Sequence, residues 1–151
     1  MAVAALGSTY LKVPTTASVK GEDSCLSKLG NSPGNFTAAK LAWVKQNEPE
    51  VFAKAAYFML PGDYIAFKLT GRFGTTPSGL SEGILWDFKR NEPATFLLEH
   101  FGIPASLIPP VSGNCAVFDE LRAEVAKELG LPKGAVVSYR AGDQPNNAFA
   151  L

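Results

Sequence analysis

The stretch Gly142-Asp143-Gln144-Pro145-Asn146-Asn147 holds the side chains of this sequence whose types and spacing best suit chemistry. It places one carboxylate among amides, directly after a run of strand-forming residues. Asp143 could accept a proton from a hydroxyl while Gln144 and the two asparagines bind neighbouring hydroxyls, as on a polyol or sugar. The same aspartate could instead cap a helix that follows it, because Asp is a preferred N-cap residue. The local sequence leaves both interpretations open.

Five other side chains have types that could serve a site, but each has a simpler interpretation. Trp43 and Trp86 could stack on a sugar ring, although packing in a core is the expected role of aromatics on such apolar faces. His100 lies near the end of a predicted helix, where the helix dipole favours a surface histidine. Cys25 and Cys115 lack metal-ligand or redox spacing, so two free thiols in a reducing cytoplasm are expected.

The elements that must position Asp143 are a strand before it and several helices. Ala135–Tyr139 is β-branched and glycine-bounded, and ligands in open α/β sheets gather at the carboxyl ends of strands. Helices are predicted over 38–48 with Thr37 as N-cap, from Pro49, over 59–71 ending at Gly71, over 94–103, and over 120–131 ending at Gly130. Between them, the hydroxyl-rich segment Thr75–Ser81 could line a polar cleft, although an ordinary loop is expected. The result is a helix-rich α/β pattern with few strands, which suggests that other strands lie outside this sequence.

The composition of the chain is that of one ordinary globular domain. Its 151 residues are 46% hydrophobic and 19% charged, and 14 basic residues balance 14 acidic ones. A net charge of zero predicts neither a nucleic-acid nor a membrane partner. Apolar runs such as Ala105–Val111 fall far below the roughly 20 residues of a membrane span, and no basic residue precedes the N-terminal apolar run as in a secretory signal. A cytoplasmic location is therefore expected.

The first 20 residues differ in character from the rest. Met1–Lys20 is rich in small and β-branched residues and has no helical period. Ser8–Val13 could form a short strand, which Pro14 would end. We expect an unmatched N-terminal segment over 1–20, followed by one structural unit over 21–151.

Three stretches together resemble a known family. They are "SPGNFTAAKLAWVKQNEPEVFAKAAYFMLPGDYIAFKLTG", "SEGILWDFKRNE" and "VVSYRAGDQPNNAFAL". They are similar to the middle of the N-terminal lobe of a xylulokinase-like member of the carbohydrate kinase family, whose members have two actin-like, ribonuclease-H-like lobes. The similarity runs from about Gly21 to Leu151, which is less than half of a full-length kinase. It implies a helix-rich, partial N-terminal lobe of an actin-like ATPase fold.

The resemblance implies roles for two residues. Asp143 matches the general base that deprotonates the sugar hydroxyl attacking the γ-phosphate of ATP, and phosphoryl transfer depends mostly on positioning and charge stabilisation. Gln144 matches a residue that contacts a substrate hydroxyl. Some xylulokinases carry Asn there and glycerol kinases carry Gln, so the polyol stays open. The implied reaction converts D-xylulose to xylulose 5-phosphate with ATP and Mg²⁺, in a full-length protein that could be a homodimer.

Several family motifs do not occur in this sequence. The Asp-x-Gly-Thr loop that grips phosphate and Mg²⁺ is absent, as is the sugar-binding Met-His segment, and the second lobe would follow Leu151. ATP and Mg²⁺ are therefore expected to bind mainly to parts outside this chain, and the chain alone is expected to be inactive. The alternative is a non-catalytic module that binds a sugar or another protein.

Overall fold

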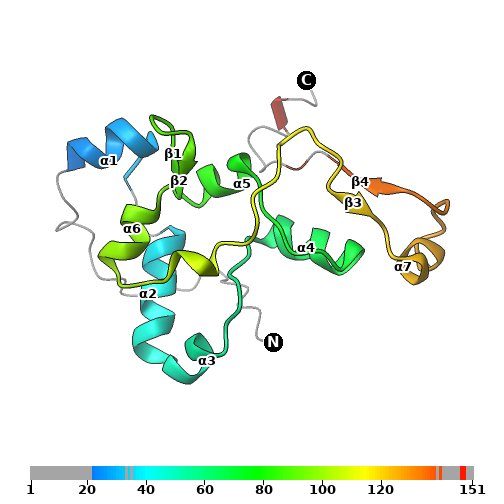
Figure 1. The fold of residues 1–151 in the computed structure, drawn as a ribbon, viewed down its shortest axis with the longest axis horizontal. Coiled ribbons are helices and arrows are strands. Elements are labelled where there is room, and N and C mark those ends of the chain that lie inside the picture. Colours follow the sequence, from blue (N-terminus) through cyan, green and yellow to red (C-terminus); the bar gives the residue numbers. More distant parts are fainter. Residues whose placement is uncertain (1–21, 33, 35, 139, 141–146, 149–151) are drawn as a thin grey trace.

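The computed structural model describes residues 22–32, 34, 36–138, 140 and 147–148. Met1–Lys20, with its predicted strand Ser8–Val13, lies outside the described residues. The described chain forms an elongated arrangement with two parts (Figure 1). A larger helical part lies at one end, a small arm over residues 119–137 lies at the other, and the helix Pro61–Thr70 lies between them.

Helices dominate the described residues, as the sequence predicted. In chain order they are α1 (Glu22–Leu29), α2 (Thr37–Asn47), α3 (Pro49–Ala53), α4 (Pro61–Thr70), α5 (Pro77–Glu82), α6 (Thr95–His100), the 3₁₀ helix η2 (Ala105–Leu107) and α7 (Ala123–Glu128).

The described strands are short and form two antiparallel pairs. Strand β1 (Trp86–Asp87) pairs with β2 (Glu92–Pro93), with Trp86 opposite Pro93. Strand β3 (Asp119–Glu120) pairs with β4 (Val136–Val137), with Asp119 opposite Val137. The segment predicted as a strand over 135–139 thus does contain a strand, β4. Among the described residues, however, it pairs antiparallel with β3 and not within an open parallel sheet.

Prolines and glycines set the ends of several helices. Pro49 and Pro61 occupy the first turns of α3 and α4, where a missing backbone N–H removes no helical hydrogen bond. Gly71 ends α4 in the left-handed conformation at φ 83°, which only glycine adopts without strain. The predicted cap of α2 was wrong, because Phe36 holds the N-cap position and Thr37 is the first helical residue.

Helix α5 lies inside the hydroxyl-rich segment, where the sequence analysis expected a loop. Thr76 is its N-cap, with Thr76 Oγ1 accepting a hydrogen bond from the Gly79 backbone N–H at 3.1 Å. Pro77 follows in the first turn. A threonine cap followed by a first-turn proline is a recognised start signal, so this helix could have been found in the sequence.

The last predicted helix is shorter than the pattern indicated. The 120–131 prediction was too long, because Glu120 belongs to β3 and α7 covers only Ala123–Glu128. In this stretch Leu121, Val125 and Leu129 recur at intervals of four, a spacing that favours one apolar helix face. Leu129 is exposed, however, and Ala126 is the residue of α7 that is buried. The spacing of Leu121, Val125 and Leu129 therefore did not mark a core-facing helix.

The main hydrophobic core lies in the larger part. It joins α1, α2, α5, α6 and the β1–β2 pair, and its buried members are Cys25, Leu29, Ala38, Leu41, Ala42, Phe58, Leu80, Ile84, Leu85, Trp86, Ala94, Leu97, Leu98, Ile103 and Leu107. None of these residues comes from α4, β3, α7 or β4. The arm is therefore attached to the rest of the described chain by contacts outside this core.

Truncation of a central residue should test the assignment of the main hydrophobic core to the larger part of the chain. Leu97 is fully buried in α6, so Leu97→Ala should lower the free energy of unfolding by about 2–5 kcal/mol through lost burial and the cavity left behind. Urea unfolding of the chain measures this change. Leu131→Ala is the matched control, because Leu131 is exposed and its truncation should change the stability by less than about 0.5 kcal/mol. Equal effects of the two variants would contradict the core assignment.

Candidate functional site

The predicted base and its neighbour, Asp143 and Gln144, lie outside the described residues. The nearest described residue on their N-terminal side is Arg140, three positions before Asp143. The surroundings of Arg140 are therefore the described part of the chain that lies nearest to these two residues on their N-terminal side in the sequence. They bring together segments that are far apart in the sequence.

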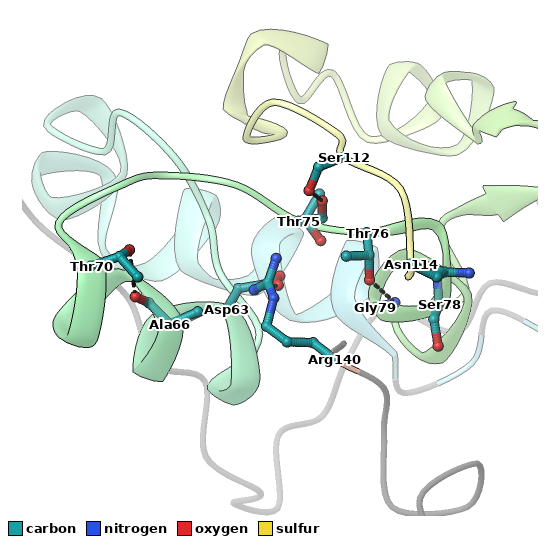
Figure 2. A network of polar contacts seen from close by, with 10 residues as sticks. All are labelled: Asp63, Ala66, Thr70, Thr75, Thr76, Ser78, Gly79, Ser112, Asn114 and Arg140. Carbon is teal, nitrogen blue, oxygen red and sulfur yellow. Dashed lines mark hydrogen bonds and ion pairs between the residues drawn. The ribbon is translucent and has the colours of Figure 1, made fainter. Parts of the chain in front are cut away.

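Arg140 forms a buried ion pair with Asp63. Arg140 Nη1 donates to Asp63 Oδ1 at 2.8 Å, and the two side chains are 12% and 7% exposed. Asp63 lies in the first turn of α4, where the positive end of the helix dipole favours a carboxylate. Figure 2 shows the pair meeting between α4 and the Thr75–Thr76 segment. The pair thus joins two positions 77 residues apart.

A second contact of Arg140 is the ring of Phe118. The guanidinium carbon of Arg140 lies 4.3 Å from the ring centroid, and that of Arg72 lies 4.9 Å from the same centroid. Arg72 also donates a hydrogen bond to the Phe118 carbonyl. The Phe118 N–H in turn donates to the Val137 carbonyl of β4 at 2.7 Å. Phe118 therefore links the loop after α4 to the strand that leads to Arg140.

Gly74 provides the space that the Phe118 ring occupies. A Cβ at Gly74 would lie 2.5 Å from Phe118 Cε2, a distance that van der Waals contact forbids. The backbone of Gly74 does not have a positive φ, so its requirement for glycine comes from packing and not from conformation. The position of the ring beside Arg140 thus depends on the absence of a side chain at Gly74.

Hydroxyl groups of the Thr75–Ser81 segment lie next to the ion pair. A Cβ at Gly79 would lie 3.2 Å from Thr75 Oγ1, 3.4 Å from Thr76 Oγ1 and 3.8 Å from Asp63 Oδ1, so these three oxygens converge on the first turn of α5. Thr75 is held by its backbone, which donates to Pro110 O at 3.0 Å and accepts from Ser112 N at 2.9 Å. The hydroxyls are thus buried within a polar network, and Figure 2 shows that network around Asp63.

Some polar atoms of this network have further hydrogen-bonding capacity. Thr75 Oγ1 and the Nε and Nη2 of Arg140 are buried and meet no hydrogen-bonding partner of suitable geometry among the described residues. Thr75 Oγ1 is nevertheless close enough to Asp63 to lower the pKa of that carboxyl. Buried polar atoms without such a partner are rare in protein interiors.

Burial dominates the electrostatics of Asp63. It raises the pKa of the Asp63 carboxyl, and the Thr75 hydroxyl and the Arg140 charge oppose this effect without cancelling it. A carboxyl with a raised pKa binds its proton more readily in the folded state. Its contribution to stability is therefore greatest below its unfolded-state pKa and falls as the pH rises through the raised value. Ionisation of Asp63 therefore costs more free energy in the folded chain than in the unfolded chain.

The other candidate residues of the sequence analysis have structural roles or are exposed. Trp86 is buried in the core, as expected, whereas Trp43 is half-buried on α2. His100 is exposed in the last turn of α6, as expected. Cys25 and Cys115 are free thiols, and burial raises the pKa of the Cys25 thiol.

The described residues do not offer a site for a metal ion. No group of three His, Cys, Asp or Glu side chains in the described part of the chain lies close enough to hold one. In addition, none of the helices over the described ranges is long and apolar enough to cross a membrane.

Comparison with known proteins identifies the class to which this arrangement belongs. Residues 23–150 match the N-terminal domain of the FGGY family of carbohydrate kinases. The structure superposes on the xylulose kinase of Rhodospirillum rubrum with a TM-score of 0.78 and 30% identity, over 88% of this chain and 28% of that chain. The fold is thus that of a segment of an actin-like sugar kinase lobe. The chain belongs to the FGGY family of carbohydrate kinases.

Sequence relatives support the same assignment. The chain is 36% identical over 96 residues to the xylulose kinase of Bacillus subtilis, covering 64% of this chain and 19% of that protein. It is 34% identical over 113 residues to the xylulose kinase of Staphylococcus xylosus, covering 75% of this chain and 23% of that protein. The chain therefore spans about a fifth to a quarter of the length of these relatives.

Filling the space at Gly74 should disturb the Phe118 contact. Gly74→Ala should lower the free energy of unfolding by about 1–3 kcal/mol, because the ring and the strand behind it must move to admit the methyl group. Thermal and urea unfolding measure the change. Gly113→Ala is the matched control, since its Cβ would meet only the Ala116 Cβ at an ordinary 3.6 Å. A neutral Gly74→Ala variant would show that the ring is not confined as described.

Proposed function

We propose that this chain is part of the N-terminal lobe of an ATP-dependent sugar kinase that phosphorylates D-xylulose to xylulose 5-phosphate. The observation that carries the proposal is the family match over residues 23–150, together with relatives described as xylulose kinases at 34–36% identity. The sugar substrate, the use of ATP and the choice of Mg²⁺ as the divalent ion are parts of the proposal. Two free thiols fit a cytoplasmic location.

In the proposed reaction Asp143 is the general base. Its carboxylate accepts the proton of the terminal hydroxyl of the sugar, whose oxygen attacks the γ-phosphate of ATP. Gln144 binds a neighbouring hydroxyl and orients the sugar for this attack. ATP and the metal ion bind mainly to parts of the kinase outside this chain, so the chain alone should not turn over either substrate.

The tests of activity use the intact kinase. By this we mean the protein encoded by the whole reading frame that contains this segment. Sequencing on both sides of the segment should reveal an Asp-x-Gly-Thr loop upstream and a second nucleotide-binding lobe downstream. A reading frame without either feature would contradict the proposed activity. In that case the chain would represent a module that kept the kinase fold without its chemistry.

Substitution of the proposed base should reduce turnover and leave substrate binding almost unchanged. Asp143→Asn removes the proton acceptor but keeps the size of the side chain, so kcat of the intact kinase should fall by about 10²–10⁴-fold. A coupled assay of ADP formation at saturating xylulose measures it. Asp23→Asn is the matched control, because Asp23 is an exposed carboxylate on α1. Normal turnover by Asp143→Asn would rule out the assigned base.

Substitution of Gln144 should affect sugar binding more than ATP binding. Loss of one hydrogen bond to a hydroxyl corresponds to about a 3- to 10-fold rise in KM for the sugar in Gln144→Ala, with KM for ATP unchanged. Gln46→Ala, at an exposed position of α2, is the control. The same assay with D-xylulose, ribulose and glycerol identifies the substrate. A higher kcat/KM for glycerol or ribulose would overturn the choice of xylulose.

A further inference from the structure

The arm over residues 119–137 has hydrogen bonds of its own. The Leu121 N–H donates to the Ala135 carbonyl at 2.8 Å, next to the paired residues of β3 and β4. At the end of α7, the Leu131 N–H donates to the Ala126 carbonyl at 2.8 Å. Over the residues that the structure describes, no side chain of the main core comes from the arm. The arm is therefore built separately from the core.

The arm is attached at both ends of α4 by polar contacts. In the first turn of α4, Asp63 pairs with Arg140, which follows β4. In the last turn, the Arg122 N–H donates to the Leu69 carbonyl at 3.0 Å, and Arg122 Nη2 donates to the Lys68 carbonyl at 2.6 Å. Asp63 and Leu69 are six residues apart, which is about 9 Å along a helix. The arm is thus held at two separate points of α4.

Apolar burial contributes little to this attachment. From residue 112 onward, the buried hydrophobic side chains in the described part of the chain are Phe118 and Ala126. Ala126 belongs to α7, so Phe118 is the side chain that packs outward, against the space at Gly74. The main core, by comparison, joins residues from five elements of the larger part. Since buried apolar area drives folding, the arm is held less firmly than the core is.

The contacts between the arm and α4 also bury polar groups without full compensation. Arg140 Nε and Nη2 are buried and meet no hydrogen-bonding partner of suitable geometry among the described residues. Burial raises the pKa of the Asp63 carboxyl, so its ionised form is disfavoured there. Separation of the arm from α4 would let water bind both groups, and buried polar groups without partners cost free energy. The polar groups therefore oppose part of the attachment that they provide.

A short exposed connection leads from the larger part into the arm. The Ser112 N–H donates to the Thr75 carbonyl at 2.9 Å. Asn114 Oδ1 accepts from the Ser78 N–H at 3.0 Å. The next three residues, 115–117, are exposed and lie in neither a helix nor a strand. A change of backbone angles in 115–117 can therefore move the arm without disturbing a buried contact of the core.

We propose that the arm, together with Phe118, opens from α4 as one unit while the main core stays folded. Opening breaks the contacts of Arg140 with Asp63 and of Arg122 with the last turn of α4, and it exposes the Asp63 carboxylate to water. Proteins open in such cooperative units when a part has few buried apolar contacts with the rest. The inference concerns the described residues alone and does not rest on the proposed function.

Hydrogen exchange of the 151-residue chain labelled with ¹⁵N tests the opening. The reporters in and beside the arm are the amides of Phe118, Leu121 and Leu131, and those of the core are Leu85 and Leu97, all of them hydrogen-bonded. After correction for intrinsic rates, the first three should exchange at one common rate, at least about 100-fold faster than the two core amides. A single rate for all five amides would overturn the proposal.

Weakening one contact with α4 should favour opening without affecting the core. Arg122→Ala removes the hydrogen bond from Nη2 to the Lys68 carbonyl, and Arg122 is exposed, so the chain should still fold. Loss of this bond should speed exchange at Leu121 and Leu131 by about 5- to 10-fold and leave Leu85 and Leu97 unchanged. Equal acceleration of both groups would show that arm and core open together, and no acceleration of either would show that Arg122 does not hold the arm. Both results contradict the proposal.

The matched control removes an exposed arginine of the larger part. Arg90 pairs with Glu92 at 3.4 Å on the β1–β2 hairpin, far along the sequence from the arm. Arg90→Ala should leave the exchange of both groups of amides unchanged. Acceleration of the arm amides by Arg90→Ala would show that the effect of Arg122→Ala is not specific to the contacts with α4.

A stronger variant separates the two parts further. Phe118→Ala removes the buried ring, so the arm should remain open and the protection of Leu121 and Leu131 should fall by at least about 10-fold more than in Arg122→Ala. Leu85 and Leu97 should keep their protection. If Phe118→Ala unfolded the core as well, the arm and the core would form one cooperative unit and the inference would fail. Arm protection equal to that of the original chain would contradict it too.

Discussion

The buried ion pair between Asp63 and Arg140 is the constraint on which the arrangement of this chain depends. The main core uses residues between Cys25 and Leu107, so the arm formed by β3, α7 and β4 has no share in it. Directional contacts join the arm to α4 instead. Besides the ion pair, the Arg122 backbone and side chain donate to the Leu69 and Lys68 carbonyls at 3.0 and 2.6 Å. Polar contacts of fixed geometry therefore take part in orienting the arm.

Apolar burial in the larger part and polar contacts between α4 and the arm are thus two different kinds of physical interaction. The core stabilises the larger part through burial of apolar surface, which tolerates small changes of angle and register. The contacts between α4 and the arm form a joint. This joint uses the Asp63–Arg140 ion pair, the face of the Phe118 ring and backbone carbonyls of α4, each of which accepts only a narrow range of geometry. Contacts of the second kind fix direction as well as distance, which apolar burial does not.

Local signals predicted most of the helices and the sequence resemblance predicted the family, but neither predicted the joint. Pro49 and Gly71 marked a helix start and a helix end because their backbone chemistry acts locally. The start of α5 at Thr76 and Pro77 carries the same kind of local signal. The Asp63–Arg140 pair had no such signal, since its partners are 77 residues apart in the sequence and only the fold brings them together.

The placement of the arm is a property of the fold, whereas the side chains that fix it belong to this sequence. A superposition that covers 88% of the chain at a TM-score of 0.78 must extend well past Leu107 and into the arm. The solved relative therefore sets its arm against its helices in a similar way. At 30% identity most of the side chains at such a joint are free to differ. The shared placement of the arm is thus a feature of the fold, and the Asp63–Arg140 pair is the means by which this sequence holds it.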